Sequence, residues 1–406
     1  MSWQSEPLSA LTLKIGSGST PRGGDSVYIS EGTTLIRSQN VYNNEFSTDG
    51  LVYIDEKTAE KMKGVSVEKE DVLVNITGDS VARCCLVHDA VLPARVNQHV
   101  AILRTNPKKL LPHFLAFYMV SPFMQAKMLS WAGTGGTRKA LTKGMLEGFE
   151  IPLPPVDVQD KIVQKIRTYN DLIENNRRRI QLLEESARLL YQEWFVHLRF
   201  PGHEQVKIAD GVPEGWEPTL VPDVIHVNPR TPVEKGKEIW YVPMSSLSET
   251  SMTANTADFE RRTKHTNVKF KKNDVLLARI TPCLENGKTG YAYFLAEDEV
   301  ACGSTEFIVL RGKRVPSEFV YCLARSYPFR ENAIKSMTGS SGRQRVQNSC
   351  FDKYAVPLPP NSILDEFVEV VQNNFDQIRN LMAQNARLAK ARDLLLPKLM
   401  SGELTV

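Results

Sequence analysis

The sequence predicts an α+β protein in which two β-rich domains are separated by two long helices that form an antiparallel coiled coil, with a pseudo-two-fold internal repeat. Three observations carry this prediction. Short motifs of the first half recur in the second half, each half contains a Pro-Leu-Pro-Pro segment, and a heptad pattern of apolar residues follows each segment. The expected boundaries are 1–156 and 201–362 for the domains and 157–200 and 363–406 for the helices.

Four matches, in the same order in both halves, indicate the repeat. They pair Lys69–Leu73 with Lys272–Leu276, Ile76-Thr77 with Ile280-Thr281, His99–Leu103 with Glu306–Leu310, and Ile151–Pro155 with Val356–Pro360. The offset drifts between 203 and 207 residues, as expected when loops change length over a shared fold. Chance could supply one such match, but not easily four in order.

Each repeat is expected to begin with short strands and to end with a helix. The expected strands are 71–76, 100–103, 274–280 and 307–310, between turns rich in Gly, Asn and Ser. Successive prolines cannot join a helix or a central strand, so the Pro-Leu-Pro-Pro segments end the β-rich parts. Asp157 and Ser362 stand where an N-cap belongs, each with Asp three residues later as in a capping box.

Both helices carry an apolar seam with 4-3-4-3 spacing over more than four heptads, which is typical of a coiled coil. Residues of this seam are expected to make the helix pair or to contact partner subunits: Ile166, Ile173, Asn176, Ile180, Leu183, Trp194, Val371, Ile378, Asn385, Leu388 and Leu395. A second seam through Val368, Phe375, Met382, Ala389 and Leu396 competes with it in the second helix. Two separate dimerisation helices remain an alternative.

Antiparallel pairing about the midpoints of the two seams would place Asn176 opposite Asn385. Two buried amides could satisfy each other there, which would fix the register at some cost in stability.

Composition and charge exclude several classes of protein. The 406 residues are 42% hydrophobic and 24% charged, which excludes a disordered or collagen-like chain. The stretch 110–129 is interrupted by Pro112, His113 and Pro122, so no membrane span is expected. The first residues resemble no secretory signal, and six cysteines without a C-x-x-C pair suggest reduced, buried thiols, so a cytoplasmic location is expected. The net charge of +3 permits a nucleic-acid partner without arguing for one.

Catalytic and metal-binding patterns are missing from the sequence. It has no (D/N)-P-P-(Y/F) tetrapeptide of adenine methyltransferases and no glycine-rich turn between strand and helix. Gly287-Lys288-Thr289 resembles the end of a phosphate loop, but Pro282 replaces the leading glycine. The seven histidines are scattered, with none near a nucleophile or at ligand spacing from a cysteine. We expect no catalytic site, no metal and no cofactor bound by this chain.

Polar, glycine-rich loops between the strands are the candidates for recognition. Their Arg, Lys, Asn, Gln and Thr side chains can bind phosphates and base edges, and glycine lets backbone N–H groups approach a phosphate. The candidate DNA-binding residues are Thr20, Arg22, Arg37, Gln39, Asn40, Arg138, Lys139, Arg230, Arg343 and Arg345. Arg138 and Arg343 are equivalent in the repeat, and for each single residue an ordinary solvated loop remains the alternative.

The order of these motifs resembles the specificity subunit of type I restriction–modification systems over essentially the whole chain. The motifs are Gly16–Pro21 and Leu35–Asn40, Glu193–Val196 with Arg199–Gly202 at the end of the first helix, and Leu395–Gly402 at the end of the second. The sequence departs from the family at Val158-Gln159 and Ile363-Leu364, where Glu-Gln is frequent, and at Val227–Arg230, which replaces a G-x-T-P loop.

This resemblance implies a non-catalytic subunit. Two target-recognition domains would each read one half of an asymmetric, bipartite site in double-stranded DNA, and the helices would set the spacer. Two modification (methyltransferase) subunits would dock on the helices and methylate adenine with S-adenosylmethionine, and restriction subunits would cut DNA with ATP and Mg²⁺.

Two alternatives stay open. One is a coiled-coil scaffold that does not read DNA. The other is the recognition part of a fused methyltransferase or nuclease, against which the complete second repeat with its final Ser401–Val406 segment argues.

Overall fold

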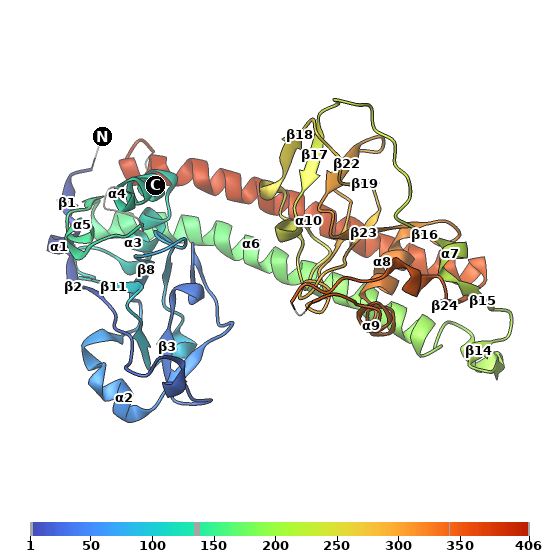
Figure 1. Ribbon diagram of the computed structural model, residues 1–406. Coiled ribbons are helices and arrows are strands. Elements are labelled where there is room, and N and C mark those ends of the chain that lie inside the picture. The colour runs from blue at the N-terminus through green and yellow to red at the C-terminus, as the bar shows by residue number, and fades with distance from the viewer. Residues whose placement is uncertain (1–2, 134–138, 341, 405–406) are drawn as a thin grey trace. The chain divides into compact units, whose positions relative to one another are not determined.

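The computed structural model describes residues 3–133, 139–340 and 342–404 (Figure 1). The chain divides into two compact units, Met1–Glu174 with Asn385–Val406, and Asn175–Gln384. Each unit contains one β-rich domain. The long helices α6 (Val156–Tyr191) and α10 (Asn361–Ser401) contribute residues to both units.

The β-rich domain of the first unit contains two four-stranded sheets. The first has the order β2 (Thr12–Ser17), β11 (Val100–Thr105), β8 (Val72–Asn75), β9 (Cys84–Leu86), with all pairs antiparallel. The second has the order β6 (Val52–Ile54), β3 (Thr33–Ile36), β10 (Ala94–Val96), β7 (Ser66–Val67), with β3 and β10 parallel. Leu73 and Ile102 of the first sheet share a buried cluster with Ile36 and Val96 of the second. Alternate residues of β8 therefore serve two cores, which explains why this strand is apolar throughout.

Helices cover the other face of the first sheet. Val72, Val74, Ala101 and Leu103 pack there against the helical residues of a separate cluster. The helices and the remaining strand pairs are α1 (Leu8–Leu11), α3 (Pro112–Met119), α4 (Pro122–Ala132), α5 (Lys143–Glu147), β1 (Ser5–Pro7) with β12 (Glu150–Pro152), and β4 (Val41–Tyr42) with β5 (Glu45–Phe46).

The second unit repeats this architecture, which confirms the internal repeat. Its sheets have the orders β16 (Ile225–Val227), β23 (Phe307–Gly312), β20 (Val275–Ala278), β21 (Thr289–Tyr291), and β18 (Glu260–Arg262), β17 (Ile239–Val242), β22 (Val300–Gly303), β19 (Val268–Lys271). The other elements are β13 (Ile208–Ala209) with β14 (Val212–Pro213), β15 (Glu217–Leu220) with β24 (Ala355–Leu358), α7 (Val221–Val224), α8 (Ser317–Arg325) and α9 (Tyr327–Lys335).

Short 3₁₀ segments connect many of these elements. They are η1 (Gly24–Val27), η2 (Ser38–Asn40), η3 (Lys63–Val65), η4 (Asp89–Val91), η6 (His203–Gln205), η7 (Met244–Ser246), η8 (Thr256–Asp258) and η9 (Asn348–Phe351).

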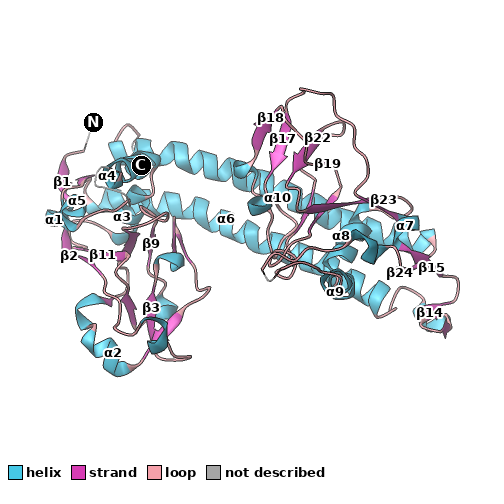
Figure 2. Cartoon of the chain, viewed as in Figure 1, coloured by secondary structure: helices cyan, strands magenta, loops and turns pink. Residues whose placement is uncertain are grey.

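The two domains differ at the outer face of one sheet. In the first unit, α2 (Glu56–Lys61) covers β3 and β6, and Leu35, Ile54 and Ala59 form a small core beneath it (Figure 2). The described connection between β18 and β19 of the second unit contains no helix.

The expected strands are present. β8, β11, β20 and β23 lie within or overlap the four predicted ranges, and Pro152 and Pro357 lie in two-stranded ladders outside the four-stranded sheets. Edge positions tolerate a proline because no ladder hydrogen bond is needed from its nitrogen.

One predicted match is shifted by a residue. The N–H groups of Ile76 and Arg279 donate to the carbonyls of His99 and Glu306, at 2.9 Å in both cases. Ile76 therefore corresponds to Arg279, and Thr77 to Ile280. Hydrogen bonding in the ladders, and not identity of the amino acids, determines which positions correspond.

The helix starts also differ from the prediction. α6 begins at Val156 and α10 at Asn361, so Asp157 and Ser362 lie in the first turn and are not N-caps. The carbonyl of Pro155 accepts the first hydrogen bonds of α6, from the N–H groups of Val158 and Gln159. The carbonyl of Pro360 accepts those of α10, from Ile363 and Leu364. A proline suits this place because the residue before N1 needs no donor of its own.

Within each unit the two helices pair in antiparallel fashion, as predicted. In the first unit Arg392 donates to Asn170 at 2.9 Å, and the Asn385 amide donates to the carbonyl of Ile173 at 3.3 Å. In the second unit Asn176 donates to Gln384 at 3.2 Å, and Asn374 donates to the carbonyl of Leu183 at 3.3 Å. Rising numbers in α6 thus meet falling numbers in α10. The expected contact of Asn176 with Asn385 would join the two units and stays a prediction.

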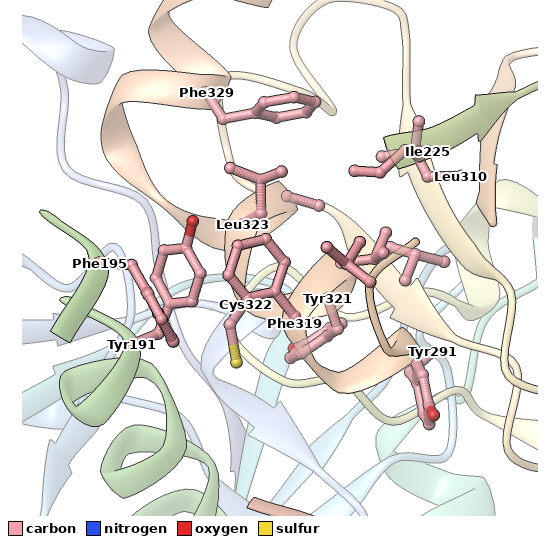
Figure 3. Close-up of a cluster of buried hydrophobic side chains, with 14 of the residues drawn as sticks. Tyr191, Phe195, Ile225, Tyr291, Leu310, Phe319, Tyr321, Cys322, Leu323 and Phe329 are labelled. Atoms are coloured by element: carbon pink, nitrogen blue, oxygen red, sulfur yellow. The ribbon is translucent and has the colours of Figure 1, made fainter. Parts of the chain in front are cut away.

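The end of each long helix completes a domain core. Leu396, Leu399 and Met400 of α10 share the core of the first unit with Ile162 and Ile166. In the second unit, α6 continues into a π-helical turn, η5 (Gln192–Val196). Figure 3 shows Tyr191 and Phe195 facing Phe319 of α8, with ring centroids 5.2 and 5.0 Å away.

Candidate nucleic-acid interface

A hollow of ≈ 530 Å³ lies in the first unit, where η2 follows β3, the loop after β8 begins, and β11 starts. Its lining includes two residues predicted from the sequence, Gln39 and Lys139, which are both exposed. The other polar and aromatic side chains of the lining, which were not among the predicted residues, are Ser38, Tyr42, Thr77, Asp79, Ser80, Arg83 and His99. Donors, acceptors and an aromatic ring therefore surround one open site.

Backbone hydrogen bonds hold the loops of this hollow together. Gly78 N–H donates to the carbonyl of Lys139 at 3.1 Å, and Leu141 N–H donates to the carbonyl of Ile76 at 2.8 Å. These bonds fix Lys139 beside the end of β8. Its side chain can therefore reach the hollow from a defined backbone position.

Two side-chain contacts orient the remaining polar groups. Thr77 Oγ1 lies 2.5 Å from His99 Nδ1, and the Arg83 guanidinium lies 4.7 Å from the centre of the Tyr42 ring. A guanidinium stacked on an aromatic ring keeps its N–H groups free in the plane.

Arg37 and Asn40 support the loop from inside. Asn40 is fully buried, and its amide donates to the carbonyls of Ser47 and Asp49, both at 3.1 Å. It also accepts from the N–H of Arg37 at 3.0 Å, and Arg37 donates to the carbonyl of Gly50 at 2.6 Å. The side chain of Asn40 is thus occupied within the protein, whereas its neighbour Gln39 is exposed and makes one long hydrogen bond, to the carbonyl of Gly50 at 3.4 Å.

Thr20 and Arg22 are exposed but do not line the hollow. The loop before them needs its glycine. Gly18 N–H donates to the carbonyl of Val100 at 3.0 Å, and a Cβ at Gly18 would lie 2.0 Å from the carbonyl oxygen of Val96. Arg138 lies outside the described residues.

The second unit has the same backbone arrangement with different side chains. Thr281 N–H donates to the carbonyl of Gln344 at 3.1 Å, and Val346 N–H donates to that of Arg279 at 2.9 Å. Arg345 donates to both oxygens of Glu306. Arg343 and Arg230, the other two predicted residues of this unit, are exposed.

The pKa values of Arg345 and of two cysteines indicate their protonation states. Hydrogen bonding to Glu306 raises the pKa of Arg345, so this guanidinium stays charged. Burial raises the pKa of the Cys84 thiol and raises that of Cys85 to about 12, so both stay protonated. Among residues 3–133, 139–340 and 342–404, no group of three or more His, Cys, Asp or Glu side chains could hold a metal ion.

The predicted seam residues are largely used inside the chain. Ile166 and Ile173 are buried in the first unit, as are Asn176, Ile180 and Trp194 in the second. Val371 and Ile378 are fully buried, and Leu183, Asn385, Leu388 and Leu395 are half-buried. The competing seam is also used, because α10 packs on two sides: Phe375 contacts the rings of Tyr291 and Tyr321.

A family model for the type I restriction modification DNA specificity domain matches residues 15–185 and 213–388. The chain belongs to this family. The two matched ranges correspond to the two repeats, each with the helix that follows it. The predicted family and its two-domain architecture are thereby confirmed.

Individual relatives agree with this assignment. The chain is similar to the type I restriction enzyme MjaIX specificity subunit of Methanocaldococcus jannaschii, at 25% identity over 303 residues, 71% of this chain and 68% of the relative. It is similar to the HindI specificity subunit of Haemophilus influenzae, at 20% identity over 438 residues, 91% of this chain and 94% of the relative. A crystal structure of the S subunit of a type I restriction–modification system from M. genitalium has the same fold, with a TM-score of 0.53 and 13% identity over 98% of this chain and 96% of that one.

In the described part of the chain, no helix is long and apolar enough to cross a membrane.

Proposed function

We propose that this chain determines which DNA sequence a type I restriction–modification enzyme recognises, and that each unit reads one half of an asymmetric, bipartite site. The observation that carries the proposal is the exchange of side chains at matching backbone positions. His99, Lys139 and Thr77 of the first unit are replaced by Glu306, Gln344 and Ile280 in the second. A shared scaffold with different donors and acceptors suits the reading of two different sequences.

The hollow of the first unit supports direct base reading. Gln39 can bind adenine in a bidentate manner, and Lys139 or Arg83 can donate to guanine. The flanking exposed residues Thr20 and Arg22 fit contacts to phosphate, which position the protein without reading sequence.

We further propose that two methyltransferase subunits and restriction subunits supply the chemistry. S-adenosylmethionine, ATP and Mg²⁺ would be bound there and not by this chain, and the complex would act in the cytoplasm. The exposed face of α6 offers a docking surface in the second unit. Arg178, Leu182, Glu185 and Leu189 follow one another at the 4-3-4 spacing of a helical stripe, and Gln192 and Val196 of η5 line the same hollow.

This stripe fits a helix of a protein partner. Leu182 and Leu189 are about half exposed, at 51% and 53%, and they line a hollow of ≈ 580 Å³ together with the exposed Arg178 and Arg188. Apolar side chains flanked by arginines complement an amphipathic helix that carries carboxylates.

Mapping methylated adenines in DNA from cells that carry this gene with its neighbouring subunit genes would test the proposal. We expect one motif with two unlike halves. A chain that assembles with its partners but gives no sequence-dependent methylation would instead be a scaffold.

A further inference from the structure

The second unit contains a side-chain pair that the first unit lacks. Arg345 Nε lies 3.0 Å from both Glu306 oxygens, and Nη2 lies 2.8 Å from Oε1. At the matching positions the first unit carries His99 and Ala140. The pair can therefore serve only the half-site that the second unit reads.

The backbone on both sides of the pair is fixed. Arg345 N–H donates to the carbonyl of Thr338 at 2.9 Å, and Thr338 N–H donates back at 3.1 Å. The carbonyl of Glu306 accepts from Arg279 N–H at 2.9 Å. Arg345 also bridges to Ile280 at the end of β20.

The pair uses only part of the guanidinium. Nε and one N–H of Nη2 are directed at Glu306, and no described residue accepts from Nη1. The side chain of Arg345 is 44% exposed, so the edge formed by Nη1 and Nη2 is open to solvent. Two parallel N–H groups on this edge match O6 and N7 of guanine in the major groove.

We propose that Arg345 reads a guanine in the half-site of the second unit, and that Glu306 is the positioning residue that holds its guanidinium in plane. The inference rests on the proposed function. Both Glu306 oxygens accept from Arg345, so the carboxylate orients this guanidinium. Holding the long side chain in advance reduces the rotamer freedom that is lost on binding.

The test uses this chain assembled with its modification subunits. Four variants are compared by methylation-motif mapping and by binding to duplexes that carry each base at every position of the site: R345A, R345K, E306Q and R314A. R314A is the control because Arg314 makes an exposed ion pair with Glu217, at 3.1 Å, elsewhere in the same unit.

We expect R345A to reduce discrimination roughly 10- to 100-fold at one guanine of one half-site. R345K should lose the same discrimination but keep the salt dependence. Lysine keeps the positive charge but lacks the two parallel N–H groups of the guanidinium. E306Q should reduce discrimination at that same position by a smaller factor, and R314A should change nothing. Thermal unfolding of each complex shows that the variants are folded.

Two results would overturn the inference. One is a uniform loss of binding to all sequences by R345A, with a salt slope lower by about one, which indicates a phosphate contact. The other is an unchanged motif in R345A and R345K. If the wild-type complex methylates no defined motif, the proposed function itself fails, which separates the two outcomes.

Discussion

Arg311 donates to both carboxylate oxygens of Asp274, at 2.7 Å each, and so joins the start of β20 to the end of β23. Asp274 is 1% exposed and also accepts from Lys271 N–H at 2.8 Å. Asp71 and Arg104 form the same bidentate pair in the first unit, at 2.8 and 2.9 Å. The K-x-D motif that reveals the repeat is thus a turn closed by a buried carboxylate.

We expect D274N to lower the free energy of unfolding by about 2 kcal/mol, because it weakens charge-assisted hydrogen bonds and leaves Arg311 without a counter-charge. Partial exposure of Arg311 keeps the cost below that of a fully buried pair. Urea unfolding followed by circular dichroism measures the change. E297Q is the control, since Glu297 pairs with Lys272 at the surface, and it should shift stability by less than about 0.5 kcal/mol. Equal effects of the two substitutions would contradict this role of Asp274.

A second buried carboxylate joins α6 to the domain of its own unit. Glu184 is 2% exposed and accepts hydrogen bonds from the Tyr321 hydroxyl and from Met252 N–H. We expect Y321F to destabilise the chain by about 2 kcal/mol, because a buried carboxylate loses one of two donors. Y293F is the matched control, because the Tyr293 hydroxyl donates to the weak acceptor Met382 Sδ and not to a carboxylate. Thermal or urea unfolding should rank the two in this order; the reverse order would show that Glu184 is satisfied in another way.

The sequence predicted the elements that repeat and missed those that depend on contacts between distant residues. Strands β8 and β20 were predictable because alternate or continuous apolar residues lie between turn residues. The helix starts were not, because Pro155 and Pro360 themselves occupy the position before the first helical residue, where no N–H donor is needed. Residues of both apolar seams of α10 are packed inside the protein. A heptad pattern interpreted as one pair of helices predicts packing along a single seam only.

The same limit applies to the candidate site. Gln39 and Lys139 were found because they stand in recognisable polar loops. His99 and Arg83 were missed because strand pairing brings them to the hollow, of β8 with β11 for His99 and of β8 with β9 for Arg83. Asn40 has a side chain that could bind a base, but it is buried because it donates to carbonyls of the loop 47–50. No local sequence pattern predicts this contact.

Gln39 and Asn40 are expected to behave differently although they are neighbours. Q39A should weaken DNA binding by the assembled enzyme by ~1–3 kcal/mol and relax one position of a single half-site, without loss of stability. N40A should lower the unfolding free energy, since it leaves the carbonyls of Ser47 and Asp49 without their donor. Duplex binding and urea unfolding of both variants separate the two effects. A stability loss in Q39A with unchanged binding would remove Gln39 from the reading surface.

His113, in α3, is expected to make stability depend on pH. Burial, and to a smaller extent the charge of Arg167, lower the pKa of its imidazole in the folded chain. The unfolded chain therefore binds more protons below about pH 6.5, and stability falls as the pH decreases through the lowered folded pKa. H113N should reduce this fall between pH 7 and 5, whereas substitution of the exposed His226 by Asn should not. Identical pH profiles for wild type and H113N would contradict the expectation.

Exchanging the first β-rich domain should recode one half-site only. Replacing residues 1–152 by the equivalent domain of a relative changes the hollow at Gln39 and His99 and leaves the second domain intact, so the methylated motif should change in one half and keep its spacer.

The structure adds a condition, because Leu396, Leu399 and Met400 of α10 pack in the core of the exchanged domain. A chimera that also takes residues 395–401 from the relative should be the more stable of the two, since core complementarity contributes the last few kcal/mol of stability. Methylome mapping and thermal unfolding of both chimeras check these outcomes. An exchange that alters both half-sites would mean that the reading surfaces are shared, and a less stable chimera with the matched residues 395–401 would mean that the helix end does not specify the core.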